Sequence, residues 1–398
     1  MKLTELEQKI ADNIAARAEA LLDDLRLHVN TPTGKGHKPG LDETRERFTA
    51  RLAALGATVE LFPGERKPDW LIGGSPDTEP PPTAVCRRTR EGLPRIMIAG
   101  HLDTVHDPES NFRELTIGPD GKTATGPGCV DMKGGLVIAV AALEALEDAG
   151  ADTSWTFFFN SDEETGSYHS RTVMEDESRA HDLGLALEPA LPGGELAIER
   201  MGAGQFMIEC RGRSAHVGRA FTDGVSAVNK LAECLVEIAK MPDPDKGRIL
   251  NVGPLQGGSV VNAVPDLARA WGNVRYPTPE VGEEIGKMLD ALATATDAVP
   301  SVAVLRSFNR PAKPMLTETE ALGLRAREVA EALGQKLPFA KTGGVCDGNI
   351  MQNVGLPTID TLGVRGGGLH TPDEWIDLSS LVERCQLLAI LIHRLCSA

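Results

Sequence analysis

A short apolar run that ends in polar, chemically reactive side chains constrains this chain more than any other feature. Residues 96–99 are apolar or small, and they lead through Gly100 into His101 and Asp103. A short apolar run of this kind, bounded by a glycine, is typical of a buried strand. Side chains two positions apart on an extended backbone point to the same side. The stretch therefore predicts an imidazole and a carboxylate that face one pocket at the end of a strand.

Two later segments repeat this pattern. The apolar residues 155–159 lead into a turn that carries Asp162, Glu163 and Glu164, and the segment LGLALEPA carries Glu188. Helical patterns lie between these strands, and parallel α/β sheets carry their functional side chains at the carboxyl ends of the strands. A single acidic turn is usually only a solvated loop. Three such strand ends in one half of a chain favour a shared site.

Asp131 lies between glycines, just before a helix predicted over residues 135–148. A carboxylate in this place has helix N–H groups nearby and few bulky neighbours, which suits a group that bridges two metal ions. It also suits a helix N-cap, and the residue taken alone favours the cap. The preceding TGPGC suggests a dinucleotide-binding loop, but the sixth position of that motif would be Asp131 instead of glycine, so this interpretation is rejected.

The character of the sequence changes near residue 200. A strand and an Arg-flanked turn with His216 are followed by two helical patterns and two more strands. This order predicts two helices on a small antiparallel sheet, inserted as a second domain into the first. We expect an α/β protein whose larger domain, residues 1–199 and 311–398, has a mostly parallel central sheet. Residues 200–310 are expected to form the smaller α+β domain.

Composition argues against several functional classes. The chain carries 57 acidic and 41 basic residues, a net charge of −16, so nucleic acids and anionic membranes are poor partners. The first 25 residues are predicted to form an amphipathic helix, and they have no apolar core typical of a signal peptide or anchor. Seven cysteines without CxxC spacing argue against a disulfide framework and favour the cytoplasm.

The candidate residues together suit a two-metal site. The candidate metal ligands are His101, Asp131, Glu164, Glu188 and His370, the last from a glycine-rich loop near the C-terminus. Two imidazoles and three carboxylates can hold two zinc ions if one carboxylate is shared, and cobalt or manganese would fit similar spacing. Glu163 is the natural general base, and Asp103 is expected to accept the free ring N–H of His101. His106 is expected to be an ordinary loop residue.

Six ordered motifs carry a family resemblance. They are GHLDTV, GPGCVDMKGG, NSDEETGS, ALEPA, SAHVG and GGGLHTPDEW. From about residue 28 to 378 the chain resembles the two-zinc M20 metallopeptidases, which include glutamate carboxypeptidases, acetylornithine deacetylases and succinyl-diaminopimelate desuccinylases. The ligands that the resemblance implies are His101, Asp131 and Glu188 for one zinc and Asp131, Glu164 and His370 for the other. It also implies that Glu163 activates a water that bridges the metals.

The resemblance further implies a lid domain that pairs with a partner lid in a homodimer. His216 would then reach the partner's active site and stabilise the oxyanion. The positions of Asn262, Arg275 and Arg310 look most like the glutamate carboxypeptidase branch, where such residues grip the carboxylate of the departing amino acid. Arg306 is the alternative to Arg310 in this role.

These observations lead to one preferred function and three alternatives. We expect an amidohydrolase that releases a C-terminal amino acid, with glutamate as one candidate, from a peptide or an N-acyl amino acid. A deacylase of the acetylornithine or succinyl-diaminopimelate type would share every catalytic residue. A non-enzymatic metal-binding module is disfavoured because all ligands and the base are present. A serine hydrolase is disfavoured because the chain has no GxSxG motif.

Overall fold

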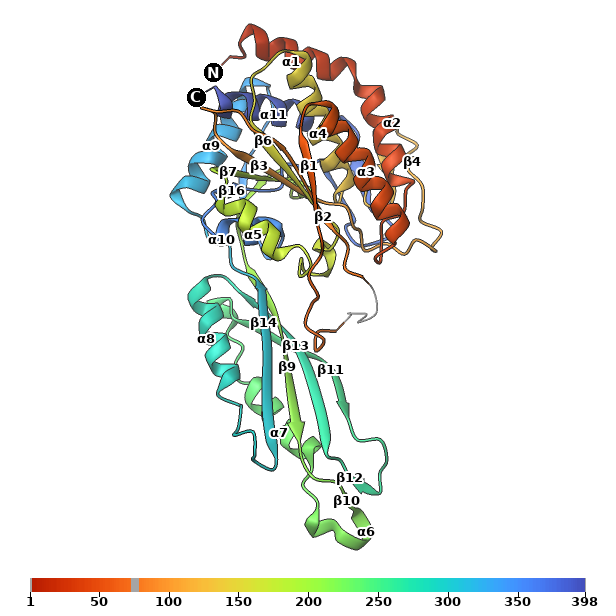
Figure 1. Ribbon diagram of the computed structural model, residues 1–398, viewed down its shortest axis with the longest axis vertical. Helices are drawn as coiled ribbons and strands as arrows, with labels where there is room; N and C mark the ends of the chain where they lie inside the picture. Colours follow the sequence, from red (N-terminus) through yellow and green to blue (C-terminus); the bar gives the residue numbers. More distant parts are fainter. Residues whose placement is uncertain (1, 73–78, 398) are drawn as a thin grey trace.

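A six-stranded mixed sheet forms the centre of the larger part of the molecule in this computed structural model, which describes residues 2–72 and 79–397 (Figure 1). The strands follow the order β1-β2-β6-β3-β7-β16, and β6, β3, β7 and β16 are parallel to one another. Their bounds are Thr58–Phe62 (β1), Thr83–Arg88 (β2), Ile96–His101 (β3), Trp155–Asn160 (β6), Leu183–Ala186 (β7) and Thr358–Ile359 (β16). The predicted α/β class with a mostly parallel central sheet is confirmed.

Helices cover this sheet and bury its apolar strands. Every residue of β3 and β6 is buried, as the continuous apolar runs predict. Helix α4 is buried along almost its whole length and packs against α11. The helices of this part are α1 (Glu5–Ala16), α2 (Ala18–Val29), α3 (Lys38–Ala54), α4 (Lys133–Asp148), α5 (Arg171–Arg179), α9 (Thr317–Ala332), α10 (Asp347–Asn353) and α11 (Ser379–Cys396).

The N-terminal segment differs from the single helix predicted for it. It forms two helices that meet at Arg17. Helix α1 buries Ile10 and Ile14 and packs against α11, whereas α2 buries Leu21 and Leu25 and packs against α4. The chain changes direction between these two packing surfaces, and the periodicity of the segment alone does not show this.

A second, antiparallel sheet extends away from the first and makes the molecule elongated (Figure 1). Its strand order is β11-β13-β9-β14, and it has its own hydrophobic cluster with α7 and α8. Its elements are β9 (Gly202–Arg211), β11 (Ile249–Gly257), β13 (Leu267–Tyr276), β14 (Ser301–Arg310), α7 (Ala227–Ile238) and α8 (Pro279–Asp290). At the end farthest from the six-stranded sheet lie β10 (Ala215–His216), α6 (Val217–Ala220) and β12 (Ala263–Val264).

Short elements complete the described chain. They are β4 (Thr116–Ile117), β5 (Thr123–Thr125), β8 (Leu196–Arg200), β15 (Phe339–Thr342), β17 (Gly366–Gly367), β18 (Trp375–Asp377), η1 (Glu163–Thr165), η2 (Phe221–Asp223) and η3 (Pro244–Lys246). Within residues 2–72 and 79–397, no helix combines the length and the apolar character needed to cross a bilayer. All seven cysteines are free and buried.

Two chain segments connect the sheets, and one buried carboxylate anchors both. Arg200 and Lys313 exchange main-chain hydrogen bonds of 2.9 and 3.0 Å. The Arg200 guanidinium lies 2.7 Å from Oδ1 of Asp360, and the Lys313 ammonium lies 3.3 Å from Oδ2. All three side chains are buried. Each connecting segment contributes one of these cations, and both cations contact Asp360. This carboxylate therefore fixes where the second sheet joins the first.

We expect Asp360→Ala to destabilise the protein strongly. Removing the carboxylate leaves two buried cations side by side, and breaking a buried ion pair in this way costs about 3–5 kcal/mol. The measurement is the free energy of unfolding from denaturant titration. The control is Asp182→Asn, whose exposed pair with Arg95 contributes little, so its midpoint stays close to wild type. Equal midpoints for the two variants would contradict the anchoring role.

Candidate metal centre and active site

The carboxyl ends of three neighbouring parallel strands meet at one edge of the six-stranded sheet. Strand β3 lies between β6 and β7, and His101 at its end is the register partner of Asn160. The turn with Glu163 and Glu164 follows β6, and Glu188 follows β7. The strand ends that the sequence pointed to are therefore adjacent in space, because the sheet places β6, β3 and β7 side by side.

Asp131 lies between two imidazoles. Its Oδ1 is 3.2 Å from Nε2 of His101, and its Oδ2 is 3.4 Å from Nε2 of His370. The same His370 nitrogen is 3.2 Å from Oε2 of Glu164. One carboxylate that offers each of its oxygens to a different histidine has the geometry of a bridging ligand. The ligand atoms of His101, Asp131 and Glu164 also lie within 4.8 Å of one another.

The alternative role of Asp131 as a helix cap is wrong. Helix α4 begins at Lys133, its capping residue is Met132, and no side-chain hydrogen bond caps it. Asp131 is one position too early, and its carboxylate is directed to the histidines. An aspartate at this position is therefore explained by its contacts with His101 and His370, and not by capping of α4.

The electrostatics of the cluster fit divalent cations. Burial raises the pKa of Glu188 well above its usual range, and the charges of Asp131 and Glu163 raise it further. Hydrogen bonds to Asp131 and Glu164 raise the pKa of His370 to about 10. Positive charge among buried carboxylates at such short range stabilises their ionised forms, and a bound metal ion supplies such charge. Mixed imidazole and carboxylate donors fit zinc and related first-row metals.

Glu163 lies beside this cluster, and 11% of its side chain is exposed. Its Oε1 accepts a 2.6 Å hydrogen bond from Nη2 of Arg310, which also donates to the Glu163 carbonyl at 3.0 Å. Burial raises the pKa of Glu163 to about 8, and the charge of Arg310 opposes this rise. A carboxyl group with a pKa near neutrality is suited to taking up and returning a proton.

Asp103 contacts His101 through a different atom than expected. The ring Nδ1 of His101 lies 2.9 Å from the main-chain carbonyl oxygen of Asp103 and 3.5 Å from its Oδ1. The carboxylate accepts hydrogen bonds from the backbone N–H groups of Glu163 and Glu164 at 3.2 and 3.0 Å. Asp103 therefore orients the imidazole with its carbonyl and holds the two-glutamate turn with its side chain.

The structure separates the two candidate arginines of β14. Arg310 is buried and donates to Glu163, to Oδ1 of Asp347 at 2.7 Å and to Oγ of Ser167 at 2.9 Å. Arg306 is half exposed and forms a two-point ion pair with Asp290 of α8. Only Arg310 of this pair belongs to the cluster around Glu163.

Arg275 lies in the same row of the second sheet as Arg310. Both residues are register partners of Ala203, Arg275 from β13 and Arg310 from β14. Residues directly opposite each other in a sheet point to the same face. On the Arg275 face of β13, Nε1 of Trp271 donates to the Trp70 carbonyl at 2.7 Å. This face therefore turns towards the larger part of the molecule.

His216 and Asn262 lie far from the metal-ligand cluster of their own chain. His216 is in β10 at the distant tip of the second sheet (Figure 1). Its Nδ1 accepts a hydrogen bond from the backbone N–H of Gly218. The Asn262 carbonyl accepts from Val217 in the same tip. The structure therefore brings these two residues together but not to the other candidates.

Comparison with known proteins decides the family. A family model described as peptidase family M20/M25/M40 matches residues 97–394. The chain belongs to this family. As an M20 protein it is a metal-dependent hydrolase, and this confirms the prediction from its six motifs.

The relatives of this M20 chain include peptidases and deacylases. It is 28% identical to carboxypeptidase G2 of Pseudomonas sp., an alignment that covers 98% of this chain and 93% of the relative. It is 29% identical to succinyl-diaminopimelate desuccinylase of Methylorubrum populi, over 83% of this chain and 87% of the relative. A tripeptidase structure from Staphylococcus aureus matches 96% of this chain and 99% of its own, with 22% identity and a TM-score of 0.74.

The sequence of this M20 chain did not indicate a role for two buried acids, Asp347 and Glu374. Asp347 at the start of α10 accepts hydrogen bonds from Arg310, Ser167 and Asn160. Glu374 accepts hydrogen bonds from backbone N–H groups of the loop that carries Asp131. Glu374 lies in the motif GGGLHTPDEW, four residues after the candidate ligand His370. This closeness to a ligand was the signal in the sequence that could have indicated its role. Asp347 gave no comparable signal.

A large cavity adjoins the ligand cluster. Its volume is about 810 Å³, and its wall includes Asp103, Asp162 and Glu164 together with the apolar residues Leu41, Pro68 and Val105. Ligand pockets for small molecules typically measure roughly 300–1,000 Å³. The cavity therefore has room for a substrate portion larger than an acetyl or succinyl group.

Proposed function

We propose that this M20 hydrolase cleaves an amide bond and releases a C-terminal amino acid, as a glutamate carboxypeptidase does. The observation that carries the proposal is the row formed by Arg275 and Arg310 on either side of Ala203. Two guanidinium groups on one face, of which Arg310 contacts the general base Glu163, suit the recognition of a substrate carboxylate. The similarity to carboxypeptidase G2 along 98% of the chain supports this choice.

The proposed metal ligands are the five residues of the sequence interpretation. His101, Asp131 and Glu188 would hold one ion and Asp131, Glu164 and His370 the other. Zinc is the proposed metal, with cobalt or manganese as alternatives. The chemistry that two such ions supply when bound is polarisation of the amide carbonyl and a lowered pKa for water.

Glu163 is the proposed general base. It takes the proton from the attacking water and passes it to the departing nitrogen, so one carboxyl group serves both halves of the reaction. Arg310 holds this carboxyl group in place and balances its charge. Asp103 keeps the backbone of Glu163 fixed through the hydrogen bond to its N–H.

We further propose a homodimer formed through the lid, residues 200–310, with residues 1–199 and 311–398 as the catalytic domain. His216 and Asn262 would then serve the active site of the partner, His216 by stabilising the oxyanion. The tip that carries them exposes large apolar side chains, among them Phe221 and Val261. Such a patch is typical of a protein interface. The cytoplasm remains our proposed location.

A deacylase of the succinyl-diaminopimelate type is the second candidate. The 29% identity to such an enzyme over 83% of the chain favours it. It would use the same ligands and base, and it would differ in which end of the substrate the enzyme recognises.

A substrate panel with metal analysis on the same sample tests the proposal. The panel contains N-acyl-glutamates, dipeptides, N-acetylornithine and succinyl-diaminopimelate. We expect turnover of the first two groups by protein that contains two divalent ions. Activity confined to the last two substrates would overturn the carboxypeptidase proposal in favour of the deacylase.

We expect Arg275→Ala to weaken binding of substrates that carry a free C-terminal carboxylate. Burial lowers the pKa of Arg275, and no ion pair to it is found among the described residues. Loss of a hydrogen bond to a charged group costs about 1.5–3 kcal/mol, so KM should rise by roughly 10- to 150-fold. The same substrate with its carboxylate converted to an amide should show no such rise. Arg269→Ala, on the same strand but paired with Glu209, is the control.

A further inference from the structure

A single buried carboxylate holds the loop in front of helix α4. Glu374 is only 1% exposed. Its Oε1 accepts hydrogen bonds from the backbone N–H groups of Val130 at 2.9 Å and Asp131 at 3.0 Å. Its Oε2 accepts from the N–H of Gly128 at 3.0 Å. Three backbone donors around one anion form a charge-assisted set that fixes the path of this loop.

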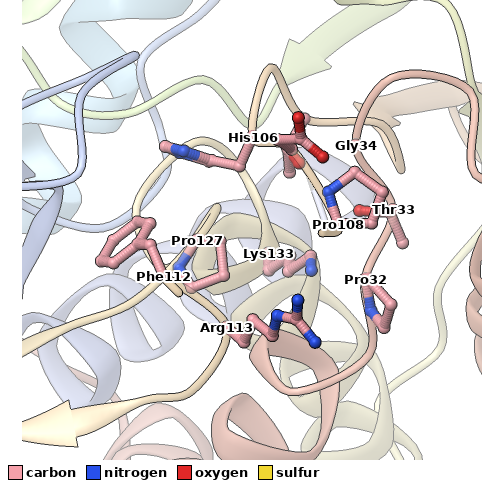
Figure 2. Close-up of a pocket in the computed structure, with 11 residues that line it drawn as sticks. Pro32, Thr33, Gly34, His106, Pro108, Phe112, Arg113, Pro127 and Lys133 are labelled. Atoms are coloured by element: carbon pink, nitrogen blue, oxygen red, sulfur yellow. The ribbon is translucent and has the colours of Figure 1, made fainter. Parts of the chain in front are cut away.

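His106 is a further partner of the Glu374 carboxylate. Its Nε2 lies 2.5 Å from Oε2 of Glu374, and its ring meets the edge of Phe112. His106 is thus more than an ordinary loop residue. Figure 2 shows His106 and Lys133 on the wall of a small cavity of about 20 Å³, enough for roughly one water molecule. Substrate has no room there, so this region is a support and not a binding subsite.

Glu374 also belongs to the segment that presents His370. The two residues are four positions apart, and the intervening turn is closed by main-chain hydrogen bonds from Thr371 to Gly368 and from Glu374 to Thr371. The Glu374 carbonyl accepts a further bond from Gly126. Glu374 therefore connects the His370 segment to the Asp131 loop twice, through its main-chain carbonyl and through its side-chain carboxylate.

We propose that Glu374 is a positioning residue that sets the spacing between His370 and Asp131, and thereby the affinity for the metal ions held there. The inference rests on the metal ligands of the proposed function. The backbone N–H of Asp131 donates to Glu374, and the Asp131 carboxylate faces both imidazoles. A shift of this loop would therefore misplace the Asp131 carboxylate. Loss of such supporting contacts typically weakens metal binding about 10- to 100-fold.

The test is Glu374→Gln in the full-length protein. Glutamine keeps the size of the side chain, but it removes the charge and presents an N–H₂ group to Gly128 and His106. We expect the dissociation constants for Zn²⁺, from competition with a chelator, to rise by about 10- to 100-fold. The absorption spectrum of the Co²⁺-loaded variant should also change, and kcat should fall more than KM changes. The matched control is Glu383→Gln, which removes a carboxylate paired with Arg365 on the nearby helix α11.

The possible outcomes separate the two proposals. Unchanged Zn²⁺ affinity and Co²⁺ spectrum, with a lower melting temperature only, would show that Glu374 is purely structural and overturn the inference. Wild-type protein that binds no metal would instead overturn the proposed function. If Glu374→Gln does not fold, His106→Ala removes the contact to Oε2 and the ring contact to Phe112, leaves the three backbone hydrogen bonds to Glu374 in place, and should weaken Zn²⁺ binding in the same direction. Unchanged binding in that variant would equally overturn the inference.

Discussion

We expect the replacement of Glu163 with glutamine to lower kcat by about 10²- to 10⁴-fold, the range that a general base typically contributes, while both metal ions still bind. Glutamine is close to glutamate in size, and its oxygen can still accept the hydrogen bond from Arg310. The amide cannot take a proton from water at neutral pH. The change therefore removes the proposed proton transfer and leaves the surrounding contacts in place.

Steady-state kinetics and metal content of the same preparation check this result. The control is Glu175→Gln on helix α5, a carboxylate paired with Arg171 and Arg179 on the surface of that helix. This control should have wild-type kcat. Turnover by the Glu163 variant within a few fold of the control would rule out Glu163 as the base. Loss of metal from the variant would mean that Glu163 acts as a ligand instead.

We expect the replacement of Asp131 with alanine to remove both metal ions and all measurable turnover. Each oxygen of this carboxylate faces a different imidazole, at 3.2 and 3.4 Å, so one substitution deletes a ligand from both sites. The loss of affinity should exceed the roughly 10- to 100-fold effect of losing an outer partner. The measurement is the ratio of metal to protein after dialysis against buffer without metal.

Glu188→Ala is the matched comparison for this second prediction. Glu188 is buried in the same cluster, but it is assigned to one ion only. Its loss should leave about one ion per chain, provided that the shared role of Asp131 is correct. Equal stoichiometry for the two variants would contradict the assignment of Asp131 as the bridging residue.

Local patterns in the sequence were sufficient for much of the site. The buried strands β3 and β6 and their polar ends follow from apolar runs that stop at a glycine or an acidic turn. Because parallel strands bring their carboxyl ends to one edge, His101, Glu164 and Glu188 could be grouped before any contact was known. The ordered motifs then supplied the family, which the matched residues 97–394 confirm.

Other features depend on contacts between distant parts of the chain. Whether Asp131 caps a helix or faces two histidines could not be decided from its neighbours, because both roles favour a short acid before a helix. Arg306 and Arg310 are four residues apart in one strand. Only the tertiary structure shows that Arg306 pairs with α8 whereas Arg310 reaches Glu163.

The sequence by itself determined the strands, the polar residues at their ends and the family. The tertiary structure alone decided which of these residues meet: Arg310 with Glu163, Asp131 with His370, and Glu374 with the Asp131 loop. The physical reason is that strand and helix patterns are set by near neighbours, whereas these contacts join residues up to 246 positions apart, as between Gly128 and Glu374. Such contacts form only when the packed sheets and helices bring the loops together.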